Sequence, residues 1–197
     1  MNQTNSHKKV LHVGCGKHGK IHQLFSGPAW SEIRLDIDPE ADPDIVNSIT
    51  DMENMSDHSV DAVYSSHNLE HLYPHEVKTA LQEFLRVLNS EGFCLLSVPD
   101  LQAAAELIAQ GKIEEPLYNS PAGPVAPLDM LYGFRPALAA GNTHMAHKTG
   151  FTDVSLAQEF INAGFTWAKY AKDNAYSLWI KAYKNKPPAD IAEQPLW

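Results

Sequence analysis

Val10-Leu11-His12-Val13-Gly14-Cys15-Gly16-Lys17-His18-Gly19-Lys20 is the stretch from which the fold of this 197-residue chain can be predicted. Its apolar beginning predicts a buried strand. The spaced glycines predict a tight turn that lets the backbone approach a ligand closely. A short helix over residues 21–25 is expected beyond the turn. The rest of the chain is then expected to build a sheet around this turn.

Alternation and apolar runs predict the other strands and helices of that sheet. The expected strands are 31–36, 45–48, 60–66, 93–98, 165–170 and 176–183, of which the last two form a hairpin. The expected helices are one from about Pro74 with an apolar stripe of Val77, Leu81, Phe84, Leu85 and Leu88, one from Leu101 to about Gln110, and one from Thr152 or Asp153 to Gly164. We expect a single domain over residues 1–197.

Two segments lack this periodicity. Residues 113–150 are rich in proline, glycine and scattered aromatic residues, and they are too long for a plain connection. We therefore expect an irregular lid or substrate-binding loop there. The tail from residue 184 is polar until Leu196-Trp197, and we expect this end to pack on its own chain more often than on a partner.

A strand, a glycine turn, a helix and a second strand ending in Asp36 form a βαβ unit. An acidic residue about twenty positions after the turn suits a pair of ribose hydroxyls. The sequence therefore predicts a nucleotide-like ligand at the carboxyl ends of the strands. Gly14-x-Gly16-x-x-Gly19 also matches the dinucleotide fingerprint by letter, so an NAD-dependent oxidoreductase stays open at this point.

Six stretches in order resemble the class I S-adenosylmethionine-dependent methyltransferases over roughly residues 8–183. They are residues 10–16, Arg34-Leu35-Asp36-Ile37-Asp38, Ile49-Thr50-Asp51-Met52, the run from Val60 to His71, Glu83-Phe84-Leu85-Arg86-Val87-Leu88 with Gly92-Phe93, and the terminal hairpin. The resemblance implies an α/β fold with a Rossmann-like, mostly parallel sheet of seven strands. Helices would cover both faces, and the last strands would form an antiparallel hairpin.

The resemblance also implies S-adenosylmethionine as cofactor and a set of residues that bind it. The expected cofactor-binding residues are Gly14, Cys15, Gly16, Asp36, Ile37, Asp51, Met52, Ser66 and His67. Asp36 would accept the ribose hydroxyls. Asp51 would accept from the adenine amino group, and the amide of Met52 would serve a ring nitrogen. This chain departs from the family pattern at His12, where many relatives carry an acidic residue, and in its glycine spacing.

The irregular stretch is expected to form the acceptor pocket, with Tyr118, Tyr132 and Phe134 as walls. Arg135 could bind a carboxylate or phosphate of the substrate, or only tie the loop down. His144 and His147 could act as general bases and contact the substrate, because imidazole titrates near neutral pH. His67 is the third catalytic candidate. Alignment of the methyl group could also suffice without a strong base.

His67-x-x-Glu70-His71 matches the inverzincin metal-binding pattern by letter. It directly follows a strand within a parallel sheet, so we favour local hydrogen bonds of Glu70 and His71 at a helix entrance. A substrate-side role of His67 or His71 is the alternative. His144-x-x-His147 could contribute to a metal site, but we expect no metal.

Composition limits the partners. The formal net charge of −9 argues against nucleic acid, because phosphate binding needs a basic face. No apolar run approaches the roughly 20 residues of a membrane span, and the beginning of the chain lacks the apolar core of a secretion signal. The two cysteines form no disulfide framework, which favours a cytoplasmic protein.

The sequence therefore predicts a methyltransferase that acts on the oxygen or nitrogen of a small molecule. The alternatives are a non-catalytic module that binds S-adenosylmethionine or docks on a partner, and an NAD-dependent oxidoreductase. Whether the chain forms a homodimer is open.

Overall fold

The computed structural model describes residues 7–17 and 20–196. Gly19, the third glycine of the fingerprint, and Trp197 therefore lie outside the described residues. None of the helices in the described part of the chain is long and apolar enough to cross a membrane.

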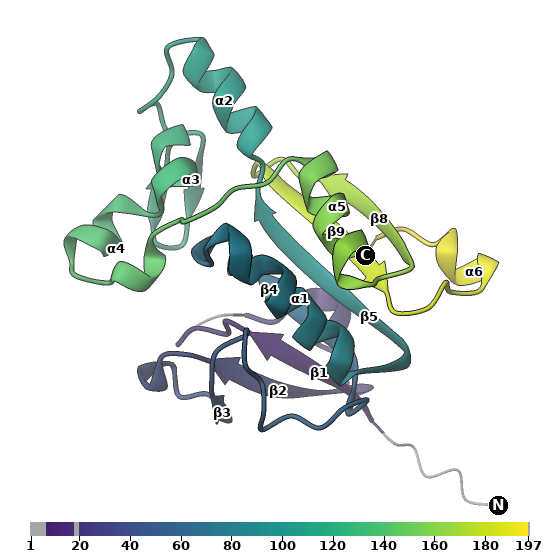
Figure 1. Cartoon of the computed structure of the whole chain (residues 1–197). Helices are drawn as coiled ribbons and strands as arrows, with labels where there is room; N and C mark the ends of the chain where they lie inside the picture. The colour runs from purple at the N-terminus through teal and green to yellow at the C-terminus, as the bar shows by residue number, and fades with distance from the viewer. Residues whose placement is uncertain (1–6, 18–19, 197) are drawn as a thin grey trace, which may run out of the picture.

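One sheet organises the molecule (Figure 1). Its strands are β1 Lys8–Val13, β2 Trp30–Asp36, β3 Ile45–Val46, β4 Val60–Ser66, β5 Leu88–Pro99, β8 Trp167–Lys172 and β9 Ser177–Tyr183. Within the described residues these seven strands have the order β3-β2-β1-β4-β5-β9-β8. The neighbours from β3 to β5 are parallel, whereas β9 is antiparallel to both β5 and β8. The predicted fold class is confirmed.

The helical elements are short apart from three. The α-helices are α1 Pro74–Val87, α2 Leu101–Ala109, α3 Pro127–Tyr132, α4 Arg135–Ala139, α5 Asp153–Ala163 and α6 Ala189–Ala192. Single 3-10 turns occur at η1 Gln23–Phe25, η2 Pro39–Ala41, η3 Leu69–His71 and η4 Thr143–Met145. The helix expected over residues 21–25 is thus only the turn η1.

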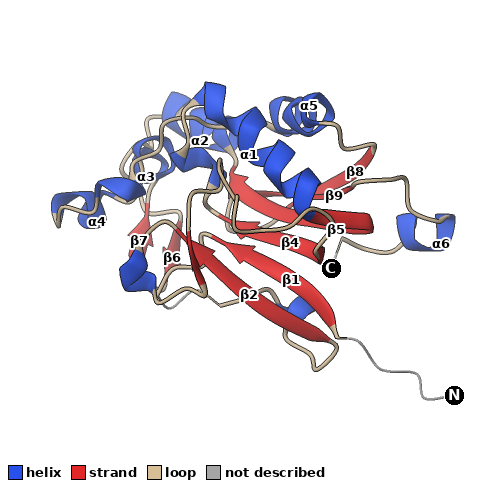
Figure 2. Ribbon diagram, turned by 60° about the horizontal axis from the view of Figure 1, so that its bottom comes forward, coloured by secondary structure: helices blue, strands red, loops and turns tan. Residues whose placement is uncertain are grey.

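Helices α1 and α5 pack together over one face of the sheet (Figure 2). Pro74 begins α1, where the missing amide hydrogen costs nothing, and Glu76 accepts from the amide of Tyr73 at 2.8 Å. Leu81 and Phe84 of the predicted stripe are fully buried in this core. The sequence analysis placed Leu88 in this helix, and that prediction is wrong. The backbone of Leu88 is already extended, and the residue begins β5.

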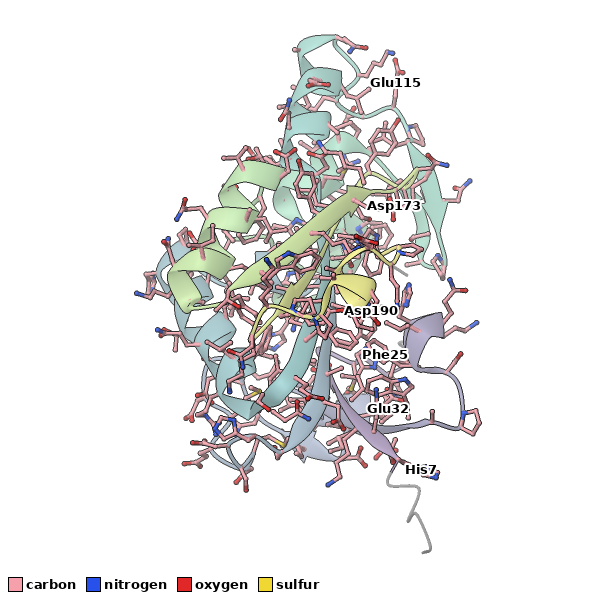
Figure 3. The ribbon with its side chains drawn as sticks, turned by 90° about the vertical axis from the view of Figure 1, so that its right-hand side faces the viewer. His7, Phe25, Glu32, Glu115, Asp173 and Asp190 are labelled. Carbon is pink, nitrogen blue, oxygen red and sulfur yellow. The ribbon has the colours of Figure 1, made fainter. Side chains whose placement is uncertain are left out.

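The other face of the sheet carries a smaller core. Phe25 of η1 packs there with Val10 and Tyr64, and Leu196 from the C-terminal segment joins the same cluster. Figure 3 shows the side on which this segment, marked by Asp190, crosses in front of the strands. The described end of the chain therefore packs on its own sheet, as expected.

Residues 113–150 are more regular than the sequence suggested. They contain a hairpin of β6 Tyr118–Ser120 and β7 Gly123–Val125, followed by α3 and α4. Each of these elements is too short to give a periodic pattern. With α2 they form an extension beyond the carboxyl ends of the strands (Figure 1).

Candidate active site

The turn after β1 has the shape that its glycines allow. Gly14 has φ +62° and Gly16 has φ +57°, which are left-handed backbone conformations. A Cβ atom on Gly14 would lie 2.5 Å from the side chain of Asn68. The turn therefore passes directly beside the segment that follows β4.

Asp36 and Arg34 hold this turn from β2. The amide of Gly16 donates to Oδ2 of Asp36 at 2.8 Å, and the amide of Asp38 donates to Oδ1 at 3.0 Å. Nη2 of Arg34 donates to the carbonyl oxygen of Gly16 at 2.6 Å. Two residues of β2 thus fix the loop that the ligand must approach.

The first cavity lies at this edge of the sheet and has a volume of about 370 Å³. Of the predicted cofactor-binding residues, it is lined by Gly14, Gly16, Asp36, Ile37 and His67. Its other lining residues are Lys17, Asp38, Ala41, Asn47, Ser48, Ile49, Asn68, His71, Leu72, Asn142, His144, Met145 and Lys148. Ile37 is 54% exposed although it is apolar, and it offers a hydrophobic surface to a ligand here.

Two of the predicted cofactor-binding residues, Cys15 and Ser66, are not among the residues that line this cavity. Cys15 is buried, and burial raises the pKa of its thiol. The hydroxyl of Ser66 lies 3.0 Å from that of Ser97. Their sequence neighbours Gly14, Gly16 and His67 line the cavity instead.

Met52 is placed differently from the expectation. Its side chain is fully buried in the core, and its amide donates to Oε2 of Glu83 at 2.9 Å. That amide is therefore not free to serve a ring nitrogen. Asp51 is exposed, and neither residue is among the described lining of the cavity. The segment from Asn47 to Ile49 lines it instead.

A second cavity of about 470 Å³ adjoins the first, with which it shares His67, His71 and Met145. Its other lining residues are Glu70, Pro99, Tyr118, Asn119, Ser120, Pro121, Ala122, Val125, Asp129, Met130, Phe134, His147 and Ala175. Tyr118 and Phe134 are among the walls that the sequence predicted. One end is therefore apolar, and the end next to the first cavity carries a carboxylate and imidazoles.

Glu70 is the most unusual group in this second cavity. It is 1% exposed, and neither carboxylate oxygen has a hydrogen-bond partner among the described residues. Burial alone would raise the pKa of Glu70, but His67, His71 and His147 around it hold this pKa below its usual value. The expected local hydrogen bonds of Glu70 are thus wrong, because its side chain points into the cavity.

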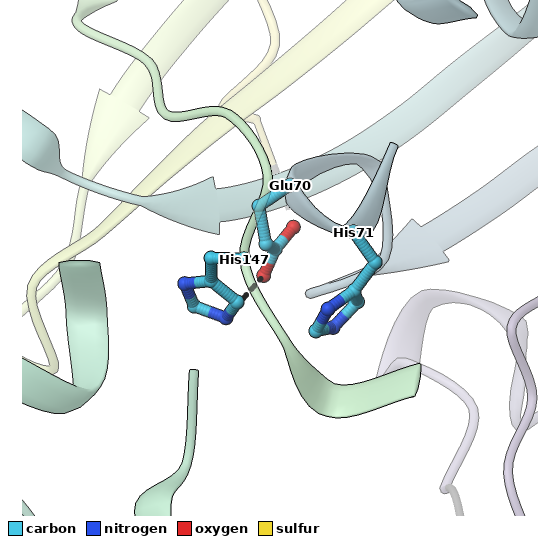
Figure 4. A group of neighbouring side chains, drawn as sticks. All are labelled: Glu70, His71 and His147. Atoms are coloured by element: carbon cyan, nitrogen blue, oxygen red, sulfur yellow. Dashed lines mark ion pairs between the residues drawn. The ribbon is translucent and has the colours of Figure 1, made fainter. Parts of the chain in front are cut away.

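His71 and His147 face this carboxylate from two different segments (Figure 4). Nδ1 of His71 lies 3.1 Å from the carbonyl oxygen of Ala146, and Nδ1 of His147 lies 2.8 Å from that of Met130. A carbonyl oxygen only accepts, so each Nδ1 carries a proton. The neutral form of each ring therefore presents an unprotonated Nε2.

His67 lies where the two cavities meet. Its Nδ1 is 3.4 Å from Oε1 of Glu70, and its Nε2 is 3.3 Å from the hydroxyl oxygen of Ser177. Burial opposes a charge on His67, but Glu70 outweighs it, so the pKa of the imidazole is raised. Its backbone has φ +50°, a strained value for a residue with a side chain.

The remaining predicted substrate residues lie apart from the second cavity. Tyr132 is 62% exposed. The guanidinium of Arg135 contacts Asp129, with Nε 2.9 Å from Oδ1, and Glu114, which favours the structural role that the sequence left open. His144 is exposed and lines the first cavity.

The cavity residues that the sequence analysis did not assign to the cofactor or the substrate fall into two groups. Asn68 and Glu70 lie within the His67-Asn68-Leu69-Glu70-His71 motif, so the letters of that motif were the available signal. Asn142, Met145 and Lys148 come from the stretch without periodicity, and only their folding against η3 places them at the cavity.

The parallel sheet with an antiparallel β9, the glycine turn after β1 and the acid at the end of β2 agree with the Rossmann-like fold that the resemblance to class I methyltransferases implied. Residues 11–96 match the family model described as a methyltransferase domain. Residues 11–96 are therefore similar to a methyltransferase domain, and S-adenosylmethionine is the cofactor that this similarity implies.

Solved structures resemble this fold at low sequence identity. A possible exported protein from Bordetella parapertussis is 18% identical with a TM-score of 0.59, and the match covers 92% of this chain but only 62% of that one. A SAM-dependent methyltransferase from Methanosarcina mazei is 17% identical with a TM-score of 0.57, covering 89% of this chain and 92% of that one.

A third similar structure contains ligands. The 1,6-didemethyltoxoflavin-N1-methyltransferase from Burkholderia thailandensis, solved with bound 1,6-didemethyltoxoflavin and S-adenosylhomocysteine, is 16% identical with a TM-score of 0.57. That match covers 91% of this chain and 72% of the other. No curated protein matches the sequence.

Proposed function

We propose that this chain transfers the methyl group of S-adenosylmethionine to an oxygen or nitrogen of a small molecule held in the second cavity. The observation that carries the proposal is the shared wall of His67, His71 and Met145 between the two cavities. A methyl group at that wall is within reach of an acceptor on the other side, and such alignment supplies much of the rate of a direct displacement.

The residues that line the first cavity support one orientation of the bound cofactor. Asp36 would accept the ribose hydroxyls while it keeps its bonds to the loop, because a carboxylate can accept about four hydrogen bonds. Ile37 and Ile49 would pack on the adenine ring. Asn68 has a buried Nδ2 without a partner among the described residues, and with Gly14 it would receive the methionine end.

His67 is the best placed proton acceptor for the reaction. It touches both cavities, and Glu70 would stabilise its imidazolium form. In the displacement, an acceptor lone pair forms the new bond to carbon. The carbon–sulfur bond breaks, and its electron pair stays on sulfur.

The acceptor is proposed to be small and not a nucleic acid. The formal net charge is −9, and the hairpin β6–β7 with α3 encloses the second cavity with walls that are largely apolar. The free and buried Cys15 and Cys94 support the proposal of a cytoplasmic protein. Its mass in solution would show whether it dimerises.

Calorimetry tests the cofactor, followed by a screen for the acceptor. We expect S-adenosylmethionine and S-adenosylhomocysteine to bind in the micromolar range, and NADH to bind much more weakly. Release of S-adenosylhomocysteine in the presence of pooled phenols, hydroxy acids and amines would then identify the acceptor class. Tighter binding of NADH than of either sulfur ligand would contradict the proposal.

A non-catalytic module would behave differently in the same screen. It would bind the sulfur ligands but release no S-adenosylhomocysteine with any acceptor. The His67→Ala variant distinguishes a proton acceptor from a structural residue. We expect a lower kcat with a pH profile that loses its acidic limb, whereas S-adenosylhomocysteine still binds.

A further inference from the structure

Three electron-pair donors converge at the polar end of the second cavity. One ligand atom each from Glu70, His71 and His147 lies within 4.8 Å of the other two. Nε2 of His147 is 4.0 Å from Oε1 of Glu70, and the rings of His71 and His147 have centroids 5.0 Å apart (Figure 4). The three groups are therefore close enough to share one ion after a small movement of their side chains.

We propose that Glu70, His71 and His147 bind a divalent transition-metal ion. The two histidines are already fixed in the form that metal binding needs, because each donates its Nδ1 proton to a backbone carbonyl. Histidines that bind metals usually direct their other ring nitrogen to a carbonyl or carboxylate in this way. The lone pair on each Nε2 is thereby left for the ion.

The carboxylate of Glu70 gives the strongest reason for a cation. It is 1% exposed, and both of its oxygens lack a hydrogen-bond partner among the described residues. A buried carboxylate without partners is costly, and such groups are normally hydrogen-bonded, paired or coordinated to a metal. His67 contributes only an ion-pair contact at 3.4 Å. A metal ion would satisfy the carboxylate and both imidazoles together.

The backbone holds the ligands together although they come from distant parts of the sequence. The amides of Lys148 and Thr149 both donate to the carbonyl oxygen of Glu70, at 2.9 and 3.2 Å. The bond from His71 to Ala146 joins the same two segments. The turn η3 and the segment 146–149 therefore form one unit around the proposed site.

Two imidazole nitrogens and one carboxylate oxygen define the class of metal. This set suits Zn²⁺, Fe²⁺, Co²⁺ or Mn²⁺, whereas Mg²⁺ and Ca²⁺ prefer oxygen ligands alone. Metal–ligand bonds of about 2.0–2.2 Å require ligand atoms roughly 3.3 Å apart. The side chains would thus close by about 1 Å on binding, a shift that rotation within the cavity can supply.

Three protein ligands leave a coordination position of the metal open toward the second cavity. The proposal that the methyl acceptor binds at this position rests on the proposed function. An acceptor hydroxyl bound there would ionise more readily, since a metal ion lowers the pKa of a bound hydroxyl. The hydroxyl proton would go to His67, and the oxygen lone pair would form the bond to the methyl carbon. The sulfur would keep the electrons of the broken bond. The acceptor would then be a hydroxyl compound that can bind a metal.

Metal titration of chelator-treated protein tests the site without any turnover. We expect one Co²⁺ per chain, with the visible absorption of a site of low symmetry, and one Zn²⁺ by calorimetry. Glu70→Gln, His71→Ala and His147→Ala should each weaken Zn²⁺ binding at least tenfold. His75→Ala is the matched control, because His75 is exposed and lies outside the cluster.

Thermal unfolding provides the check on folding. Zn²⁺ should raise the Tm of the unmodified protein and of the His75→Ala variant, but not that of the Glu70→Gln variant, which changes no side-chain volume. The proposal is wrong if the three variants bind Zn²⁺ as tightly as the unmodified protein. It is also wrong if the His75→Ala substitution abolishes the binding of Zn²⁺, because His75 would then be a ligand of the ion.

S-adenosylhomocysteine binding separates this proposal from the proposed function. Glu70 and His147 do not belong to the described lining of the first cavity, so their variants should retain the affinity for S-adenosylhomocysteine. A protein that binds Zn²⁺ but no sulfur ligand would refute the proposed function and leave the metal site supported. A protein that binds S-adenosylhomocysteine but no Zn²⁺ would refute the metal site and leave the proposed function supported.

Discussion

The amide of Gly16 donates to Oδ2 of Asp36 at 2.8 Å, so the carboxylate proposed for the ribose also fixes the glycine loop. The carbonyl of the same glycine is bound by Arg34. The loop is thus shaped by β2 before any ligand arrives. A ligand that adds two hydroxyl donors to Asp36 would meet a carboxylate that is already oriented, which reduces the entropy that binding must overcome.

Replacing Asp36 by alanine should therefore weaken the binding of S-adenosylhomocysteine by about 10–100-fold. Hydrogen bonds to a charged group contribute about 1.5–3 kcal/mol, and each 1.4 kcal/mol is a tenfold change in affinity. Calorimetry measures the effect. Asp190→Ala, which changes an exposed carboxylate on α6, should bind normally. An unchanged affinity of the Asp36→Ala variant would show that the ligand lies elsewhere.

A methyl group on Gly14 should disturb the same site from the other side. The Gly14→Ala variant needs an unfavourable φ of +62° and places its Cβ 2.5 Å from Asn68. We expect it to lose about 1–3 kcal/mol in the free energy of unfolding and to bind S-adenosylhomocysteine more weakly. In the Gly27→Ala control, the new Cβ would have no described atom within 4 Å. Equal behaviour of the two variants in urea unfolding would contradict this explanation.

The sequence predicted the central strands of the sheet well because they contain buried apolar runs. β4 begins at Val60 and ends at Ser66 as expected, and α5 lies between the cap Thr152 and the left-handed Gly164. Such caps and runs act locally, so one chain segment contains the whole signal. The prediction of a helix over residues 21–25 was wrong, because only the turn η1 forms there.

The active site could be predicted only in part because it depends on contacts between distant segments. Asp36 and Gly14 were found since they belong to one βαβ unit. The contact of Glu70 with His147 exists because the amides of Lys148 and Thr149 bind the backbone of η3, and no local pattern reports that pairing. Likewise, the burial of Met52 follows from Glu83 and Arg86 of α1, which bind its amide and carbonyl.

Mild acid should destabilise the protein through His12. Burial holds the pKa of His12 below its usual 6.5, although Glu32 opposes this effect. The unfolded chain then takes up the proton first, so the stabilisation is complete above about pH 6.5 and is lost as the pH falls through the lower pKa of the folded state. His12→Asn should flatten the loss of stability between pH 7.5 and 5.5 in urea unfolding.

His75→Asn, a substitution at an exposed histidine, is the control variant for that pH experiment. His22, whose pKa is also lowered by burial, should contribute to the same slope, so some loss will persist in the His12→Asn variant. An undiminished slope in that variant would mean that His12 is not a source of the acid sensitivity.

Leu196 should stabilise the fold although it lies in the C-terminal segment. It is 7% exposed and belongs to the cluster of Val10, Phe25 and Tyr64, while Nζ of Lys169 donates to the carbonyl oxygens of Ala192 and Gln194. Leu196→Ala should cost about 2 kcal/mol, the lower end for a buried leucine, and lower the Tm by about 4–8 °C. Val154→Ala, at a residue that is 76% exposed, should change the Tm little. If both variants melt like the unmodified protein, the segment does not hold this face of the sheet in solution. Its leucine would then be free for a partner.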